Sequence, residues 1–237
     1  MAKNQVKSKE RVAEHGEVFT AEREVNAMLD LVKQETERID SRFLEPACGD
    51  GNFLAEILRR KMEVVKAQYR KSPADYEKYA VLAVTSIYGV DILQDNVEEC
   101  RKRLFEIWDK EYTANCKSEA SDECREAVRF ILSRNILCGN ALTLRKVNGN
   151  GVDTDEPINF SEWAFVSSYM MKRSDYRLDV LMNENPDEEN YNMQLTLFAD
   201  DAAGSDNWMI DPETGKSVPK PIAEYPPIDY RKVHQHG

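Results

Sequence analysis

The sequence predicts an α/β protein with a mostly parallel sheet, and two observations point to that class. Short apolar runs alternate with segments whose apolar residues recur at helical spacing, an order that favours parallel strands joined by right-handed helical crossovers. One such run, 43–46, leads into two glycines, Gly49 and Gly51, and then into a helical pattern from Asn52. A strand, a tight loop and a helix in this order bring backbone N–H groups close to a ligand above the strand.

The elements up to the second strand follow from periodicity. Residues 1 to about 16 read as a flexible polar arm, and residues 22–37 predict an amphipathic helix that packs on the sheet. After the first strand, a helix is expected from Asn52 to at least residue 66. Residues 66–78 indicate a polar insertion with a helical turn and a loop, and 79–86 indicate the end of a helix.

The second half of the alternation is equally regular up to about residue 146. A second strand is expected at 87–90, helices at 94–112 and 122–133, a third strand at 136–138, and the segment 157–166 is apolar enough for one more. Beyond it the chain changes character, because 183–220 is rich in acids and turn residues and poor in apolar ones, which predicts loops or disorder. Residues 222–228 are expected to dock back as an extended apolar segment anchored by Tyr225 and Ile228. The expected division of the chain is an arm at 1–15, a folded domain at 16–182 and an irregular acidic extension at 183–237.

Composition narrows the classes of function. The 237 residues are 41% hydrophobic and 32% charged, with a net charge of −11. No apolar run approaches the roughly 20 residues of a membrane span, and the N-terminus lacks a secretory signal, so a cytoplasmic location is expected without membrane contact. The five cysteines form no Cys-x-x-Cys pair and the three histidines are scattered, so no metal site is expected.

Four segments of the chain resemble one family. Glu45-Pro-Ala-Cys-Gly-Asp-Gly-Asn-Phe-Leu54 is similar to the S-adenosylmethionine loop of the DNA adenine-N6 methyltransferases of restriction-modification systems. Segments 16–21, 87–92 and 136–142 look like three further motifs of that family in the family's order, so the resemblance covers roughly residues 14 to 145. It implies a Rossmann-like class I methyltransferase fold with a mostly parallel sheet, which the sequence leaves open to being incomplete. It also implies S-adenosylmethionine as cofactor and DNA as partner, with methyl transfer to a flipped adenine.

The resemblance also implies a set of cofactor-binding residues. They are Phe19, Thr20, Glu45, Ala47, Gly49, Gly51, Asn52, Phe53, Asp91, Ile92, Asn140 and Ala141. Among them Asp91 would bind the ribose hydroxyls, Ile92 would lie against the adenine ring, and Asn140 would receive the adenine amino group.

Each of these positions has a plainer interpretation. The glycine loop is also an ordinary strand-to-helix turn, although the dinucleotide fingerprint is disfavoured because Leu54 stands where it needs a third glycine. Asp91 could instead cap the helix that begins near Asn96, and Asn140 could be a loop residue. Thr20 and Asn52 could be helix caps.

The family's catalytic signature, Asn or Asp followed by Pro-Pro and an aromatic residue, does not occur in this chain. The nearest string is Tyr225-Pro226-Pro227-Ile228, and no catalytic residue is assigned. This departure keeps a second hypothesis open, in which the chain is a catalytically inactive cofactor-binding or scaffolding subunit that works through a partner chain. The acidic net charge is compatible with it, because DNA affinity depends on neutralising phosphates.

Overall fold

The structure of the chain is a computed structural model that describes residues 8, 11, 13, 20–182, 207–212 and 214–236. Most of the expected N-terminal arm, together with Phe19 and residues 183–206 of the expected acidic extension, lies outside the described residues. None of the helices in the described part is long and apolar enough to cross a membrane.

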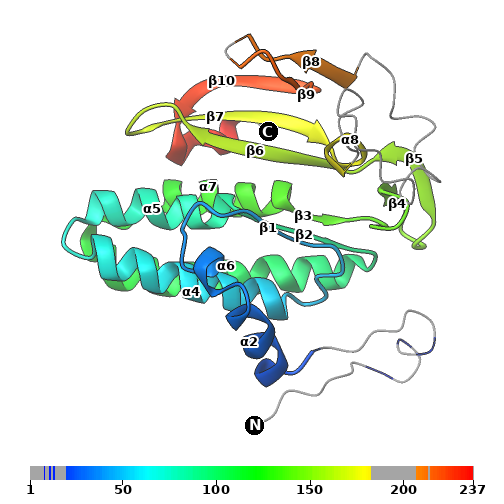
Figure 1. The fold of residues 1–237 in the computed structure, drawn as a ribbon. Helices are drawn as coiled ribbons and strands as arrows, with labels where there is room; N and C mark the ends of the chain where they lie inside the picture. Colours follow the sequence, from blue (N-terminus) through cyan, green and yellow to red (C-terminus); the bar gives the residue numbers. More distant parts are fainter. Residues whose placement is uncertain are drawn as a thin grey trace.

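The described part is a mixed α/β structure built on a small parallel sheet (Figure 1). Its strands are β1 (Phe43–Glu45), β2 (Ile87–Asp91) and β3 (Ile136–Cys138), in the order β1-β2-β3 with both pairs parallel. Phe43 is in register with Ile87, and Gly89 with Ile136. These are the three strands that the apolar runs predict, so the predicted start of a parallel sheet is confirmed. Among the described residues, this sheet has three strands only.

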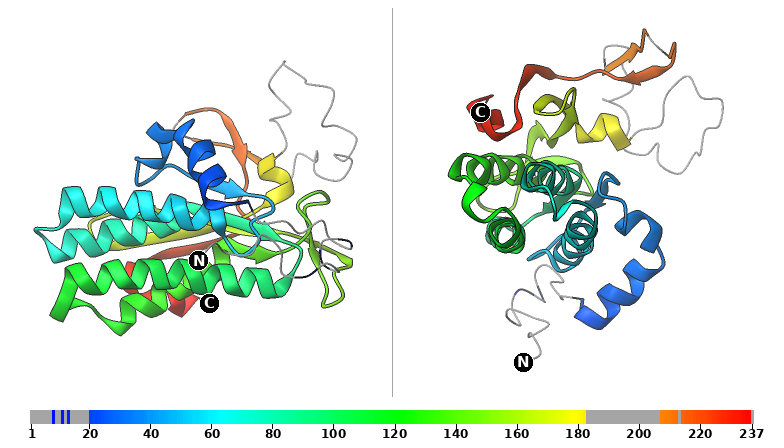
Figure 2. Two further views of the ribbon diagram at one scale, coloured as in Figure 1. Left: turned by 90° about the horizontal axis from the view of Figure 1, so that it is seen from below. Right: turned by 90° about the vertical axis from the view of Figure 1, so that its left-hand side faces the viewer.

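Each crossover between these strands is a pair of helices rather than a single helix. Between β1 and β2 lie α4 (Asn52–Tyr69) and α5 (Pro73–Thr85), and between β2 and β3 lie α6 (Gln94–Cys116) and α7 (Asp122–Asn135), with the short η1 (Lys117–Glu119) between them. Ser72 and Ser121 cap α5 and α7 by accepting backbone N–H groups from Asp75 and Cys124. The four helices gather beside one another, as the end-on view in Figure 2 shows, and enclose most of the apolar core.

The N-terminal helix is divided. The pattern over 22–37 predicts one helix, but the structure has α2 (Glu22–Asp30) and α3 (Lys33–Thr36), because Val32 leaves helical geometry with φ −117° and ψ 31°. Val25 and Leu29 are the buried residues of α2, which packs against α4 as expected.

A second, antiparallel sheet covers the other face of the parallel sheet. It consists of β6 (Asn159–Phe165), β7 (Met170–Arg177) and β10 (Ala223–Asp229) in the order β10-β7-β6. Tyr88 and Val90 of β2 point to this side and form a small apolar cluster with Ile158, Phe160 and Leu178. The strand expected at 157–166 therefore exists, but it pairs with β7 and does not extend the parallel sheet.

The remaining elements are short. They are the hairpin of β4 (Arg145–Val147) with β5 (Asp153–Pro157), the helix α8 (Leu178–Met182), the hairpin of β8 (Trp208–Ile210) with β9 (Ser217–Pro219), and the 3₁₀ segment η4 (Tyr230–His236). The described part of the expected irregular extension is thus regular over much of its length, which differs from the prediction for 183–237.

Residues near the C-terminus are ordered because their side chains find buried partners. The extended segment expected at 222–228 is β10, and the Arg173 guanidinium lies 4.2 Å from the centre of the Tyr225 ring. The β7–β10 register shifts between Tyr225 and Ile228, where the two prolines cannot donate ladder hydrogen bonds. In η4, Tyr230 and Arg231 donate to the buried Glu77 carboxylate of α5, at 2.6 Å each.

Lys61 is the one buried lysine of α4, and its side chain is fully buried. Its ammonium donates to the Ile39 carbonyl at 3.1 Å, to the Ser41 carbonyl and to Ser86 Oγ at 2.5 Å. Burial lowers the pKa of Lys61 to about 7 because desolvation penalises the charged form. The lysine thereby ties the segment before β1 to the segment before β2.

The lowered pKa of Lys61 should make the unfolding free energy of the protein depend on pH. Because its pKa is lower in the folded than in the unfolded chain, the unfolded chain binds more protons between about pH 7 and pH 10.5. The unfolding free energy should therefore rise with pH in this window, by up to about 1.4 kcal/mol per pH unit, relative to a Lys61→Met variant. Urea denaturation of both proteins from pH 6 to 10 tests this, and parallel pH profiles would contradict it.

Candidate functional site

The loop between β1 and α4 has the geometry that its glycines predict. Gly49 and Gly51 have φ of 54° and 87°, in the left-handed region that favours glycine. Gly51 is the N-cap residue of α4 and supplies no capping side chain, so the interpretation of Asn52 as the cap is wrong. The first-turn N–H groups of α4 therefore receive no cap from Gly51, and such groups suit an anionic or polar ligand.

Gly51 also lies where a side chain would collide with α6. A Cβ built on Gly51 would stand 2.6 Å from Cys100 Sγ. The loop thus packs directly against α6, and a residue without Cβ is required there for both backbone and packing reasons.

Asp91 is the last residue of β2, and its side chain joins the glycine loop to the start of α6. Its carboxylate accepts from Gly49 N and Leu93 N at 2.9 Å each and from Asn96 Nδ2 at 3.2 Å. Leu93 is the N-cap residue of α6, so the helix-cap interpretation is correct in part, since Asp91 serves the start of α6 without being its N-cap. A carboxylate offers about four acceptor positions, which leaves room for one further donor.

Glu45, Ala47 and Phe53 flank the same loop. Burial raises the pKa of Glu45, and a backbone hydrogen bond from Ala47 acts against that rise. Phe53 packs at the edge of the main core. Glu45 is thus a half-buried carboxyl group at the carboxyl end of β1.

Asn140 follows β3, near the carboxyl ends of the parallel strands, but its side chain forms hydrogen bonds within its own loop and with Asp153. Its Oδ1 accepts from Leu142 N at 3.0 Å and its Nδ2 donates to Asp153 Oδ1 at 3.0 Å. Ala141 packs beside the small apolar cluster. Ile92 follows Asp91, and its carbonyl accepts from Cys138 Sγ at 3.6 Å.

Thr20 and Asn52 meet across the loop. Asn52 Nδ2 donates to the Thr20 carbonyl at 3.1 Å, and Asn52 Oδ1 accepts from the Arg103 guanidinium at 2.7 Å. The N-cap of α2 is Ala21, so Thr20 is not that helix's cap. Arg103 was not singled out from the sequence, because one arginine on a charged helix carries no local signal.

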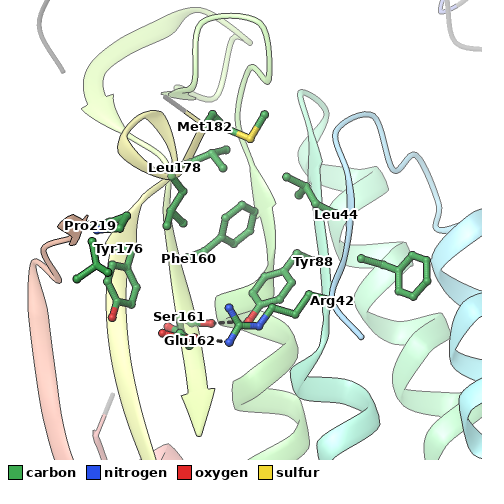
Figure 3. Close-up of a pocket in the computed structure, with 13 residues that line it drawn as sticks. Arg42, Leu44, Tyr88, Phe160, Ser161, Glu162, Tyr176, Leu178, Met182 and Pro219 are labelled. Carbon is green, nitrogen blue, oxygen red and sulfur yellow. Dashed lines mark hydrogen bonds and ion pairs between the residues drawn. The ribbon is translucent and has the colours of Figure 1, made fainter. Parts of the chain in front are cut away.

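A cavity of about 540 Å³ lies between the two sheets, apart from the glycine loop (Figure 3). Tyr88, Phe160 and Leu178 point into it, and Arg42 reaches across to Glu162 at one end. None of the predicted cofactor residues that the structure describes lines this cavity. It borders β1, which pairs only with β2 among the described residues.

Comparison with known families identifies the class of protein that this fold and this loop belong to, the DNA methyltransferases of restriction-modification systems. The family model of the MmeI DNA-methyltransferase domain matches residues 19–148, more than half of the chain, and the chain belongs to this family. No curated protein and no solved structure matches it. The matched range contains the glycine loop, Asp91 and Asn140, and ends at the β4–β5 hairpin.

The one Pro-Pro sequence of the chain, the nearest match to the family's catalytic signature, lies in the antiparallel sheet. Pro226 and Pro227 lie in β10, at the register shift against β7.

In the part of the chain that the structure describes, no group of three or more histidine, cysteine or acidic residues could hold a metal ion.

Replacing Gly51 with alanine should destabilise the protein through both the backbone and Cys100. We expect Gly51→Ala to lower the unfolding free energy by about 2–4 kcal/mol, of which about 1–2 kcal/mol comes from the left-handed backbone. Gly151→Ala is the matched control, because its φ is 72° but its Cβ would meet nothing within 4 Å.

The packing part of this effect should depend on Cys100. In a Cys100→Ala background, Gly51→Ala should cost no more than Gly151→Ala, as measured by urea denaturation. Additive effects of the two substitutions would show that the loop does not pack on Cys100 as described.

Proposed function

We propose that this chain binds S-adenosylmethionine for DNA adenine-N6 methylation in a restriction-modification system. The observation that carries the proposal is the glycine loop, held to the Asp91 carboxylate at the carboxyl end of β2, inside the matched methyltransferase domain. In open α/β sheets, ligands bind beside the carboxyl ends of the strands.

The residues present fit the chemical groups of this cofactor. The N-terminus of α4 suits the carboxylate of its methionine part, because Gly51 leaves the first-turn N–H groups uncapped. The remaining acceptor position of Asp91 suits a ribose hydroxyl. Ile92, the next residue, supplies an apolar side chain for the adenine ring. Asn140 fits less well, because its amide is already hydrogen-bonded on both sides.

When bound, the cofactor supplies a methyl group on a positively charged sulfur. The tasks of this chain are to orient that group and to hold its ribose and methionine ends. Transfer to an adenine amino group forms an N–C bond, breaks the S–C bond and releases a proton from the nitrogen. The proposal assigns no residue of this chain to binding the adenine or accepting that proton.

A second candidate is a cofactor-binding subunit without catalysis of its own, completed by a partner chain. The specific observation in its favour is the absent Asn/Asp-Pro-Pro-aromatic sequence. Among the described residues β1 pairs only with β2, so its other edge, with the cavity beside it, offers a place where such a chain could add. The net charge of −11 also favours a partner that contacts the DNA phosphates.

Cofactor binding by the unmodified chain is the first test. Calorimetry with S-adenosylhomocysteine should show binding, and Asp91→Ala should weaken it by about 1.5–3 kcal/mol through the loss of one charge-assisted hydrogen bond. Asp109→Ala is the matched control, because Asp109 lies on α6 but pairs with Arg125 at 2.7 Å, at the other end of that helix from Asp91. No binding at millimolar ligand would overturn the proposal.

Methyl transfer separates the two candidates. Because the chain lacks the catalytic tetrapeptide, the isolated protein should transfer little or no tritiated methyl to mixed-sequence DNA, even where it binds the cofactor. Asp91→Ala serves as the control for contaminating enzymes. Transfer that survives purification and disappears in that variant would favour the self-sufficient methyltransferase over the subunit.

A further inference from the structure

Arg103 of α6 contacts Asp50, which lies in the glycine loop, and Asn52, the first residue of α4. One guanidinium nitrogen lies 2.7 Å from Asn52 Oδ1, 3.3 Å from the Asp50 carbonyl and 3.4 Å from Asp50 Oδ1. Asp50 stands between the two glycines with left-handed φ, and its side chain is only 1% exposed. A carboxylate buried to this degree needs a positive partner, and Arg103 supplies one from α6.

The contact with Asn52 has a second consequence, because an amide side chain has two chemically different ends. With its oxygen accepting from Arg103, Asn52 turns its NH₂ group toward the Thr20 carbonyl at 3.1 Å. The guanidinium, which has donors but no acceptor, excludes the flipped amide, since that would oppose two donors. Arg103 thus selects the orientation in which Asn52 joins the loop to the segment before α2.

We propose that Arg103 is a positioning residue of the cofactor site, which fixes Asp50 and the amide orientation of Asn52 and thereby holds the glycine loop and Thr20 together for binding. Its guanidinium acts through these residues and not on the ligand. The affinity part of this inference rests on the proposed function, whereas the orientation of Asn52 does not.

The first experiment uses nuclear magnetic resonance of the protein without ligand. The side-chain NH₂ signals of Asn52, assigned with Asn52→Ala, should be shifted from the free-amide position in the unmodified chain and should move toward it in Arg103→Met. Arg101→Met is the matched control, because Arg101 also lies on α6 but donates to the Ile136 and Ser133 carbonyls, away from the loop. Asn52 signals that stay unchanged in Arg103→Met would overturn the proposal.

The second experiment measures affinity for S-adenosylhomocysteine by calorimetry. Arg103→Met should weaken binding by about tenfold or more, Arg103→Lys should lose less because it keeps the charge and one hydrogen bond, and Arg101→Met should stay within about threefold of the unmodified chain. In an Asn52→Ala background most of the effect of Arg103→Met should disappear.

The outcomes separate the two proposals. If the unmodified chain binds no S-adenosylhomocysteine, the proposed function fails and the Asn52 signals alone decide the role of Arg103. If it binds, equal weakening by Arg103→Met and Arg101→Met would indicate a general loss of stability and overturn the positioning role. If Arg103→Met does not fold, Arg103→Lys replaces it in both measurements, and a variant identical to the unmodified chain in both would contradict the proposal.

Discussion

The candidate site depends on one carboxylate, that of Asp91. It receives N–H groups from the glycine loop and from the start of α6, two segments more than 40 residues apart in the sequence. An acid at the end of a buried strand costs free energy unless it is paired, and here backbone donors satisfy it at the positive end of a helix. The group that would contact a ribose is therefore also the group that shapes the loop. Asp91→Ala would therefore change ligand binding and loop structure together. Arg103, whose guanidinium donates to Asp50 and Asn52, is for that reason the more informative residue to vary.

A second buried carboxylate, Glu77, makes the C-terminal segment part of the fold. Tyr112, Tyr230 and Arg231 all donate to it, so η4 is bound to the helix layer. In the antiparallel sheet, the guanidinium of Arg173 pairs with Asp175 at 2.7 Å and lies over the Tyr225 ring. These interactions hold β10 on β7 and keep the antiparallel sheet over the open face of the parallel one. That face would otherwise expose the apolar side chains of β2.

Local patterns predicted the local features of the fold. The strand at 136–138 and the glycine loop follow from short apolar runs and from glycines that need unusual φ angles. For α5, the sequence predicts the end of a helix at 79–86, and 66–78 is interpreted as a polar insertion with a helical turn and a loop. The first turns of α5 are polar, although Ser72-Pro73 is a start signal that the sequence does contain. Long-range pairing was not predictable. Nothing local to 157–166 indicates that β6 prefers β7, or that β7 also pairs with a strand about 50 residues further on. Arg103 belongs to the same group, because its partners lie about 50 residues earlier.

The absence of the catalytic tetrapeptide is compatible with a stable structure, because the glycine loop and Asp91 are positioned by β1, β2 and the helices that follow them. The loop after β1 and the acid after β2 need only these two strands and their helices, and both are complete here. Their stability comes from the four-helix core and from the antiparallel sheet, neither of which requires a further parallel strand. The fold can therefore retain the whole glycine loop while, among the described residues, β1 pairs at one edge only. If the second candidate function holds, this chain would hold the methyl donor, and a partner chain at that edge would present the base.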